Sequence, residues 1–179
     1  HCRNGHDLAP GDFLCLVCGE AVSDGAAATV AKASLRGAAG WGIGAALPVT
    51  SGEADLFFVR RPEGPVCAVF KHYRRGIEPE TALYPALREL HPDHGPRLLG
   101  DGRFEERAFE VWEFVPHGSL AEIPASEKSH PDFVRAAVAE IGRALAGLEA
   151  AQIRHRDLKP ANVLVRSRDP LDLVVADFS

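Results

Sequence analysis

The feature that most constrains this chain is the run HRDLKPANVLV, which spans His155–Val165 and is followed by Asp177-Phe178. An apolar run, Val163–Val165, directly follows the polar residues, and a second one, Leu173–Val175, leads into Asp177. Short valine-rich runs bounded by polar residues are typical of paired strands. The pattern therefore predicts a polar loop, a β-hairpin and then an aspartate. It disfavours the simpler interpretation of a capped turn with a solvated lysine.

These residues resemble the catalytic motifs of the eukaryotic-type Ser/Thr protein kinases of bacteria, and the resemblance runs from about Leu47 to Phe178. It implies that Asp157 accepts the proton of the substrate hydroxyl and that Lys159 neutralises phosphate charge. It also implies that Asn162 and Asp177 bind Mg²⁺. A lysine two places after the aspartate favours protein kinases over phosphotransferases that act on small molecules.

The segment after Leu47 has the pattern of a small antiparallel sheet. Three β-rich runs, Leu47–Val49, Leu56–Val59 and Val66–Phe70, are separated by turn residues. Lys71 follows the last run in the order AVFK, which resembles the VAIK motif of the kinases. The resemblance implies that Lys71 contacts the α- and β-phosphates of ATP. A lysine at the end of a strand is otherwise most often a solvated charge.

The phosphate loop is where the chain departs from the kinase pattern. In place of GxGxxG it has Thr50–Asp55, in which Gly52 is the one glycine. Close approach of backbone to phosphate is therefore expected only around Gly52. Glu53 and Asp55 add negative charge near the expected polyphosphate. This departure keeps open a second hypothesis, a pseudokinase that binds nucleotide without catalysis.

A helix is predicted from Pro79, because proline suits a first helical turn and apolar residues follow at helical spacing. In the kinases a glutamate of this helix pairs with the strand lysine. Glu80 is the best match to that glutamate, and Glu78 and Glu89 are alternatives. Each of the three could equally be a surface acid.

A strand is predicted over Phe109–Val115, and it resembles the kinase hinge. The resemblance implies that backbone groups of Glu113 and Val115 bind the adenine and that Trp112 is the gatekeeper. Further on, Pro131–Ala151 has apolar residues on one face, which predicts a strongly amphipathic helix that supports the catalytic loop.

The first residues form a separate cluster of potential metal ligands. Cys2, His6, Cys15 and Cys18 have the spacing CxxxH and CxxC and resemble a bacterial zinc ribbon. The resemblance implies a closed, structural Zn²⁺ site within residues 1–20. Inert thiols beside a surface histidine are the alternative. Residues 21–46 are rich in Ala and Gly and are expected to form a linker, or in part a weak helix.

Composition sets wider limits. The chain has 179 residues, 46% of them hydrophobic and 25% charged, which is typical of a globular protein. A net charge of -5 does not suggest nucleic acid as a partner. No apolar run approaches the roughly 20 residues of a membrane span, and no signal peptide is recognised, so a cytoplasmic location is expected. The chain contains no Met and stops at the Asp-Phe pair, so we expect it to be a fragment with apolar surface left on the amphipathic helix.

The combined prediction is an α+β protein with three parts. A zinc ribbon (1–20) and a linker (21–46) precede a protein-kinase-like domain (47–179). In that domain an antiparallel sheet plus a helix makes the N-terminal lobe, and the C-terminal lobe is incomplete. Its cofactors would be ATP and Mg²⁺, with ATP bound between the lobes, and its partner a protein substrate. A nucleotide-binding pseudokinase and a zinc-ribbon interaction protein are the other hypotheses.

Overall fold

A computed structural model describes residues 42–47, 52–60, 66–104 and 106–178. The four cysteine and histidine positions of the predicted zinc ribbon lie outside these residues, as does most of the predicted linker. The chain divides into two compact units. The first holds the described parts of His1–Pro79 together with Leu98–Phe114, and the second holds Glu80–Arg97 and Val115–Ser179.

The first unit is a five-stranded antiparallel sheet with the strand order β1-β2-β3-β5-β4. The strands are β1 (Gly42–Ala46), β2 (Ala54–Arg60), β3 (Val66–Tyr73), β4 (Leu98–Phe104) and β5 (Arg107–Glu113). The alternation of side chains along a strand gives the sheet two different faces.

One face of this sheet carries the main apolar core of the unit. Its fully buried members are Val59, Ala68, Phe70, Phe109 and Val111. The rings of Phe70 and Phe109 stack with centroids 5.1 Å apart. Such aromatic pairs add to the stabilisation that comes from burial alone. The core therefore fastens β3 to β5, the two strands that carry Lys71 and the predicted hinge.

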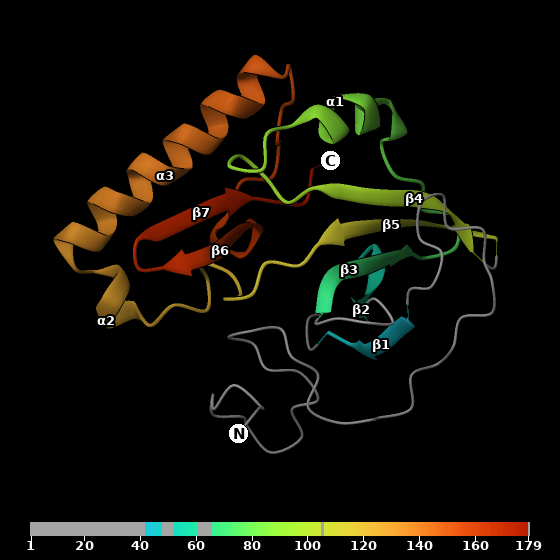
Figure 1. The fold of residues 1–179 in the computed structure, drawn as a ribbon, viewed down its shortest axis with the longest axis horizontal. Helices are drawn as coiled ribbons and strands as arrows, with labels where there is room; N and C mark the ends of the chain where they lie inside the picture. The colour runs from blue at the N-terminus through green and yellow to red at the C-terminus, as the bar shows by residue number, and fades with distance from the viewer. Residues whose placement is uncertain (1–41, 48–51, 61–65, 105, 179) are drawn as a thin grey trace. The chain divides into compact units, whose positions relative to one another are not determined.

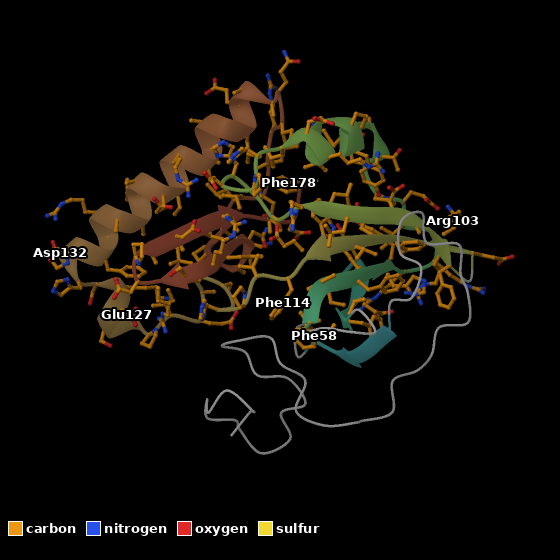
Figure 2. The ribbon with its side chains drawn as sticks, viewed as in Figure 1. Phe58, Arg103, Phe114, Glu127, Asp132 and Phe178 are labelled. Carbon is orange, nitrogen blue, oxygen red and sulfur yellow. The ribbon has the colours of Figure 1, made fainter. Side chains whose placement is uncertain are left out.

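Close to the hinge, Phe58 and Phe114 meet edge to face. Their ring centroids are 5.5 Å apart and their planes are inclined at 81°, and Figure 2 shows the two side chains next to each other. Phe114 directly follows β5. The contact thus fixes the end of that strand against β2.

Two strands of the first unit have bounds that differ from those predicted. Most of the strand expected at Leu47–Val49 lies outside the described residues, and the first described strand is Gly42–Ala46, inside the expected linker. Its residues have weak β-propensity, so it forms because its backbone pairs with β2. The predicted strand Phe109–Val115 is shifted to Arg107–Glu113, and Val115 lies beyond it in the second unit.

The second unit contains the helices and a hairpin. They are a 3₁₀ turn (Thr81–Leu83), α1 (Tyr84–Glu89), α2 (Ala125–Lys128), α3 (Pro131–Ala150), a second 3₁₀ turn (Pro160–Asn162), β6 (Val163–Arg168) and β7 (Leu171–Val175). The hairpin and α3 are confirmed as predicted. In Figure 1, α3 runs along the β6–β7 hairpin, and it packs on β7. None of the helices in the described ranges has the length and apolarity needed to cross a membrane.

The helix expected from Pro79 begins later, at Tyr84. Pro85 explains the difference, because it has no N–H to donate to the carbonyl of Thr81 and its ring crowds that carbonyl. A regular α-helix can therefore start only just before Pro85, and the residues ahead of it form a 3₁₀ turn. The apolar side chains of Tyr84, Leu87 and Leu90 are buried, as the helical spacing predicted.

The core of the second unit lies where α3 covers the hairpin. Its buried members are Ile123, Ala137, Val163, Val165 and Leu173. Two apolar residues of the predicted buried face of α3 are instead exposed, Val134 by 45% and Val138 by 66%.

Candidate active site

The sequence predicts that Asp157, Lys159 and Asn162 act together, and they are in direct contact. Lys159 Nζ donates to Asp157 Oδ2. Asn162 Nδ2 donates to the same oxygen at 3.2 Å and to the Asp157 backbone carbonyl at 3.0 Å. The 3₁₀ turn of Pro160–Asn162 folds the chain back and brings the amide to the aspartate. The loop thus presents a carboxylate, an ammonium group and an amide at one point.

The electrostatics of this cluster keep Asp157 ionised. The hydrogen bond from Lys159 is the main cause that holds the pKa of Asp157 below its usual value. Desolvation opposes this effect on the pKa, while the charge of Lys159 and the hydrogen bond from Asn162 act in the same direction as the Lys159 hydrogen bond. About half of the surface of each of the Asp157 and Lys159 side chains is exposed. An ionised, accessible carboxylate can accept a proton from a hydroxyl group.

The side chain of Asn162 is held by Asp157. Its side-chain NH₂ is engaged by Asp157, and the residue is buried. The amide oxygen is therefore the atom left for a cation, and oxygen is the ligand atom that Mg²⁺ prefers. No group of three or more His, Cys, Asp or Glu side chains suited to a metal ion occurs among the described residues. A site made of one amide, one carboxylate and phosphate oxygens does not need such a group.

The hairpin connects Asn162 to the residue before Asp177. Val163 pairs with Val175, and the Ala176 N–H donates to the Asn162 carbonyl at 2.9 Å. The two residues predicted to bind Mg²⁺ are therefore tied together through the backbone, although many residues separate them in sequence.

His155 also contacts this junction, and it was assigned no role from the sequence. Its ring is buried, and Nε2 lies 2.8 Å from the Ala176 carbonyl oxygen. The ring centroid is 5.6 Å from that of Phe178. His155 thus anchors the chain on both sides of Asp177. The sequence feature that could have indicated this role is the position of His155 as the first residue of the His155-Arg156-Asp157 motif.

Two non-glycine residues of this site have a positive φ, as do Glu106 and Gln152 elsewhere in the described residues. Arg156 has φ of 62° and Asp177 has φ of 67°. Non-glycine residues rarely adopt this left-handed conformation, which costs on the order of 1 kcal/mol each. Such strain persists where surrounding contacts enforce it, and it is concentrated at functional sites.

The predicted residues of the first unit lie on the sheet. Lys71 is in β3, partly buried, with Nζ 5.0 Å from the centroid of the Tyr73 ring. Glu113 ends β5. A Cβ added at Gly52 would meet no atom within 4 Å. The described surroundings of Gly52 therefore impose no steric need for glycine.

Asp55, one of the two acids near Gly52, has surroundings that the sequence did not suggest. Arg107 donates to Asp55 Oδ2 at 2.8 Å and also to the Tyr73 carbonyl at 2.6 Å. This hydrogen bond is the main cause that lowers the pKa of Asp55. The negative charge of Asp55 is therefore compensated within the sheet. The expected repulsion of a polyphosphate by Asp55 is correspondingly weakened.

The three candidate partners of Lys71 have different environments. Both carboxylate oxygens of Glu78 accept from Arg103 Nη1 at 2.9 Å. Glu80 is exposed and lines a cavity of about 300 Å³ in the second unit, together with Leu83, Gln152, Arg154 and Arg156. Glu89 is exposed at the end of α1. Glu80 remains the predicted partner, and Glu78 is the alternative whose charge is already paired.

Comparison with known proteins identifies a family for this chain. Residues 46–154 match the phosphotransferase enzyme family, APH. The chain is 27% identical over 111 residues to an Aurora kinase of Yarrowia lipolytica, covering 62% of the chain and 28% of that protein. It is 32% identical over 99 residues to the serine/threonine-protein kinase RAD53 of Saccharomyces cerevisiae, covering 55% of the chain and 12% of that protein.

Solved structures give the same fold. The kinase domain of Mycobacterium tuberculosis PknI matches with a TM-score of 0.64 and 20% identity, over 82% of this chain and 61% of that one. Rad53 in complex with AMP-PNP matches with a TM-score of 0.62 and 25% identity, over 75% of this chain and 38% of that one. The chain thus spans less than two thirds of each of these relatives. It belongs to the phosphotransferase enzyme family, and its described residues have the fold of part of a protein-kinase domain.

Proposed function

We propose that the protein is an ATP-dependent kinase that transfers the γ-phosphoryl group of ATP to Ser or Thr hydroxyls of a protein substrate. The observation that carries this proposal is the contact of Asp157 with Lys159 and Asn162 in a loop tied to Asp177. The two relatives described above, named as an Aurora kinase and a serine/threonine-protein kinase, support the substrate class. The alternative hypothesis is a pseudokinase that binds nucleotide without catalysis.

The proposed reaction assigns one task to each residue. Asp157 accepts the hydroxyl proton as the new oxygen–phosphorus bond forms, and the bond from the γ-phosphorus to the bridging oxygen breaks to release ADP. Lys159 is placed beside Asp157, where its charge can offset that of the transferred group. Mg²⁺, held by Asn162 and Asp177, supplies further charge neutralisation.

Nucleotide binding is proposed to need residues that are far apart in the sequence. Lys71 would contact the phosphates, with Glu80 as its predicted partner and Gly52 allowing close approach of the backbone. The backbone groups of Glu113 and Val115 would bind the adenine. In the same proposal residues 47–179 form the kinase-like domain, and residues 1–20 form a zinc ribbon whose Cys2, His6, Cys15 and Cys18 bind Zn²⁺.

Phosphate transfer to a generic protein substrate tests the proposal. Incorporation from labelled ATP is measured for the wild-type protein and for Asp157→Asn. Loss of one general base costs about 10²- to 10⁴-fold in rate, so we expect a decrease of that size. Asp132→Asn is the matched control, because Asp132 is an exposed acid at the start of α3 that pairs with Arg135. Its location is labelled in Figure 2.

Two results would contradict the proposal in different ways. If the wild-type protein binds ATP·Mg²⁺ but transfers no phosphate, the pseudokinase hypothesis is correct. If Asp157→Asn retains the wild-type rate, Asp157 is not the base. Loss of Mg²⁺-dependent ATP binding in Lys71→Ala and Asp177→Asn is expected as well, and unchanged binding would refute the assigned roles.

A further inference from the structure

A network of four charged side chains in the second unit was assigned no role from the sequence. Arg143 of α3 donates to Glu140 Oε2 at 2.6 Å and to Asp172 Oδ1 at 3.3 Å. Arg166 of β6 lies 3.8 Å from the other carboxylate oxygen of Asp172. The exposed fraction of these side chains is at most 34%. The network balances two positive and two negative charges, and it joins α3, β6 and β7.

Both arginines also bind the backbone of one segment, residues 92–95. Arg166 Nη2 donates to the Pro92 carbonyl at 2.7 Å, and Arg143 Nη1 donates to the Asp93 carbonyl at 2.5 Å. Hydrogen bonds from charged donors are stronger than those between neutral groups. The network therefore fastens the start of this segment to α3 and to β6.

The fastened segment lies against the residues that flank Asp177. The His94 carbonyl accepts from the Val175 N–H of β7 at 3.1 Å. A Cβ added at Gly95 would lie 3.0 Å from Cζ of Phe178, which Figure 2 labels, and 3.0 Å from the Val175 carbonyl oxygen. The absence of a side chain at Gly95 allows this close approach. The segment thus contacts the chain both before and after Asp177.

The backbone conformation of Asp177 depends on such support. Its φ of 67° is one that a non-glycine residue keeps only where surrounding contacts enforce it. His155 supplies one set of these contacts, through the Ala176 carbonyl and the Phe178 ring. Segment 92–95 supplies a second set. Release of the segment would therefore allow Asp177 to relax.

We propose that Arg143 and Arg166 are positioning residues, which hold segment 92–95 against Val175 and Phe178 and thereby keep Asp177 in the conformation that binds Mg²⁺. They act through the segment and not on the nucleotide. This inference rests on the proposed function for the role of Asp177 in binding Mg²⁺, whereas the anchoring itself is independent of nucleotide.

Nuclear magnetic resonance on the chain without nucleotide tests the anchoring. It gives the rate of hydrogen exchange of the Val175 N–H and the Cα chemical shift of Asp177, which reports φ. Arg143→Met and Arg166→Met each remove one charged donor and keep an apolar stem. In both variants we expect exchange at Val175 to rise at least about tenfold, because a hydrogen bond to a charged group contributes a factor of that size or more. The Asp177 shift should move toward the value of an extended residue.

Two controls separate release of the segment from a general loss of stability. The Leu120 N–H donates to the Val163 carbonyl at 2.7 Å and serves as the reference amide, because its acceptor belongs to β6 and not to the segment. Global destabilisation raises exchange at both amides, whereas local release raises it at Val175 alone. Arg135→Met makes the same substitution at an exposed arginine of α3 that pairs with Asp132. It should change neither readout.

A further variant perturbs the same contact and leaves every charge in place. In Gly95→Ala the added Cβ has to displace Phe178 or Val175, so the Asp177 shift should change although both arginines remain. In all three variants the affinity for ATP in the presence of Mg²⁺ should fall about tenfold, because residues that orient a metal ligand typically contribute 10- to 100-fold to metal affinity. The affinity for ATP in EDTA should not change.

Several results would overturn the proposal. It is wrong if exchange at Val175 and Leu120 rises by the same factor, because the network then only stabilises the unit. It is also wrong if the Asp177 shift stays at its wild-type value in both arginine variants, or if Asp177 moves and the affinity in Mg²⁺ is unchanged. If the arginine variants do not fold, Gly95→Ala decides by the same two criteria for Asp177. Absence of ATP binding by the wild type would refute the proposed function instead, and the resonance data would still decide the anchoring.

Discussion

Two glycines of α3 provide a matched test of how tightly the second unit is packed. Gly142 is exposed, and a Cβ there would meet no atom within 4 Å. A Cβ on Gly147 would approach the Cγ, Cδ2 and Nε2 atoms of His94 closer than 3.0 Å. Both glycines lie in the interior of one helix, so the same substitution has the same intrinsic effect on helix stability at each. The difference in stability between Gly142→Ala and Gly147→Ala therefore measures the contact with His94.

His94 has little freedom to give way. The preceding residue, Asp93, accepts a hydrogen bond on its carbonyl from Arg143 at 2.5 Å, and the His94 carbonyl accepts from the Val175 N–H at 3.1 Å. The backbone is thereby fastened to α3 and to β7. The contacted atoms also include Cγ, at the base of the ring, which moves only when the whole side chain moves.

The expected magnitudes follow from these facts. Replacing an interior helical glycine by alanine stabilises by about 0.5–1 kcal/mol, and Gly142→Ala should show this gain. Overpacking costs about 1–3 kcal/mol, so Gly147→Ala should be less stable than the wild type by up to about 2 kcal/mol. For a chain of this size, about 1 kcal/mol corresponds to a shift in Tm of roughly 2–4 °C.

Urea denaturation of four proteins checks the reasoning. They are the two alanine variants, His94→Ala, and the double variant with His94→Ala and Gly147→Ala. With the ring removed, Gly147→Ala should stabilise as Gly142→Ala does, and the coupling of the two sites should be about 1–3 kcal/mol. Equal effects of the two glycine substitutions in the presence of His94 would refute the packing argument.

Three other predictions concern charges and metal. Because Lys159 lowers the pKa of Asp157, Lys159→Ala should raise that pKa toward its usual value, so that the carboxylate becomes protonated at a higher pH. Side-chain carbon chemical shifts measure this, and an unchanged titration would contradict the assigned cause. The ion pair with Arg107 lowers the pKa of Asp55. The stabilisation that this pair gives the folded state is therefore present at neutral pH and is lost as the pH falls through the folded-state pKa of Asp55. Since Asp55 is 46% exposed, Asp55→Asn should destabilise by less than about 1 kcal/mol, and only above that pH; equal loss at all pH values would refute the pairing. For the zinc ribbon, elemental analysis should find one Zn²⁺ per chain and less in Cys15→Ser. Freely reactive thiols at Cys2, Cys15 and Cys18 in protein prepared without chelator would contradict it.

The sequence predicted correctly those helices and strands whose own residues have a strong local pattern. The hairpin strands around Val163–Val165 and Leu173–Val175 and the long helix α3 have strong periodicity, and all three are confirmed. The first strand was missed because Gly42–Ala46 has no strand signal of its own and depends on pairing with β2. The start of α1 was misplaced because Pro79 was taken as the first-turn proline, whereas Pro85 occupies that place.

The candidate site divides in the same way. Asp157, Lys159 and Asn162 are close in sequence, and their contact follows from a short turn, so a linear motif is sufficient to predict it. The pairing of Asp55 with Arg107 and the location of Glu110 opposite Lys71 depend on strand register. Register is set by the packing of whole strands, and a shift of one residue would reverse the face on which every side chain projects. No local pattern contains that information.

Register also determines the spacing of the two residues proposed to bind Mg²⁺. Asn162 precedes β6 and Asp177 follows β7, so both lie at the open end of the hairpin, where Val163 pairs with Val175. Val163, Val165, Leu173 and Val175 are each at most 2% exposed, so a slip of the hairpin by one residue would expose these side chains and would turn their neighbours into the core. Each buried side chain of this kind contributes about 1.5–3 kcal/mol, so the slipped state is strongly disfavoured. The apolar core under α3 therefore holds in place the two residues that are proposed to bind Mg²⁺, without direct contact between their side chains being required.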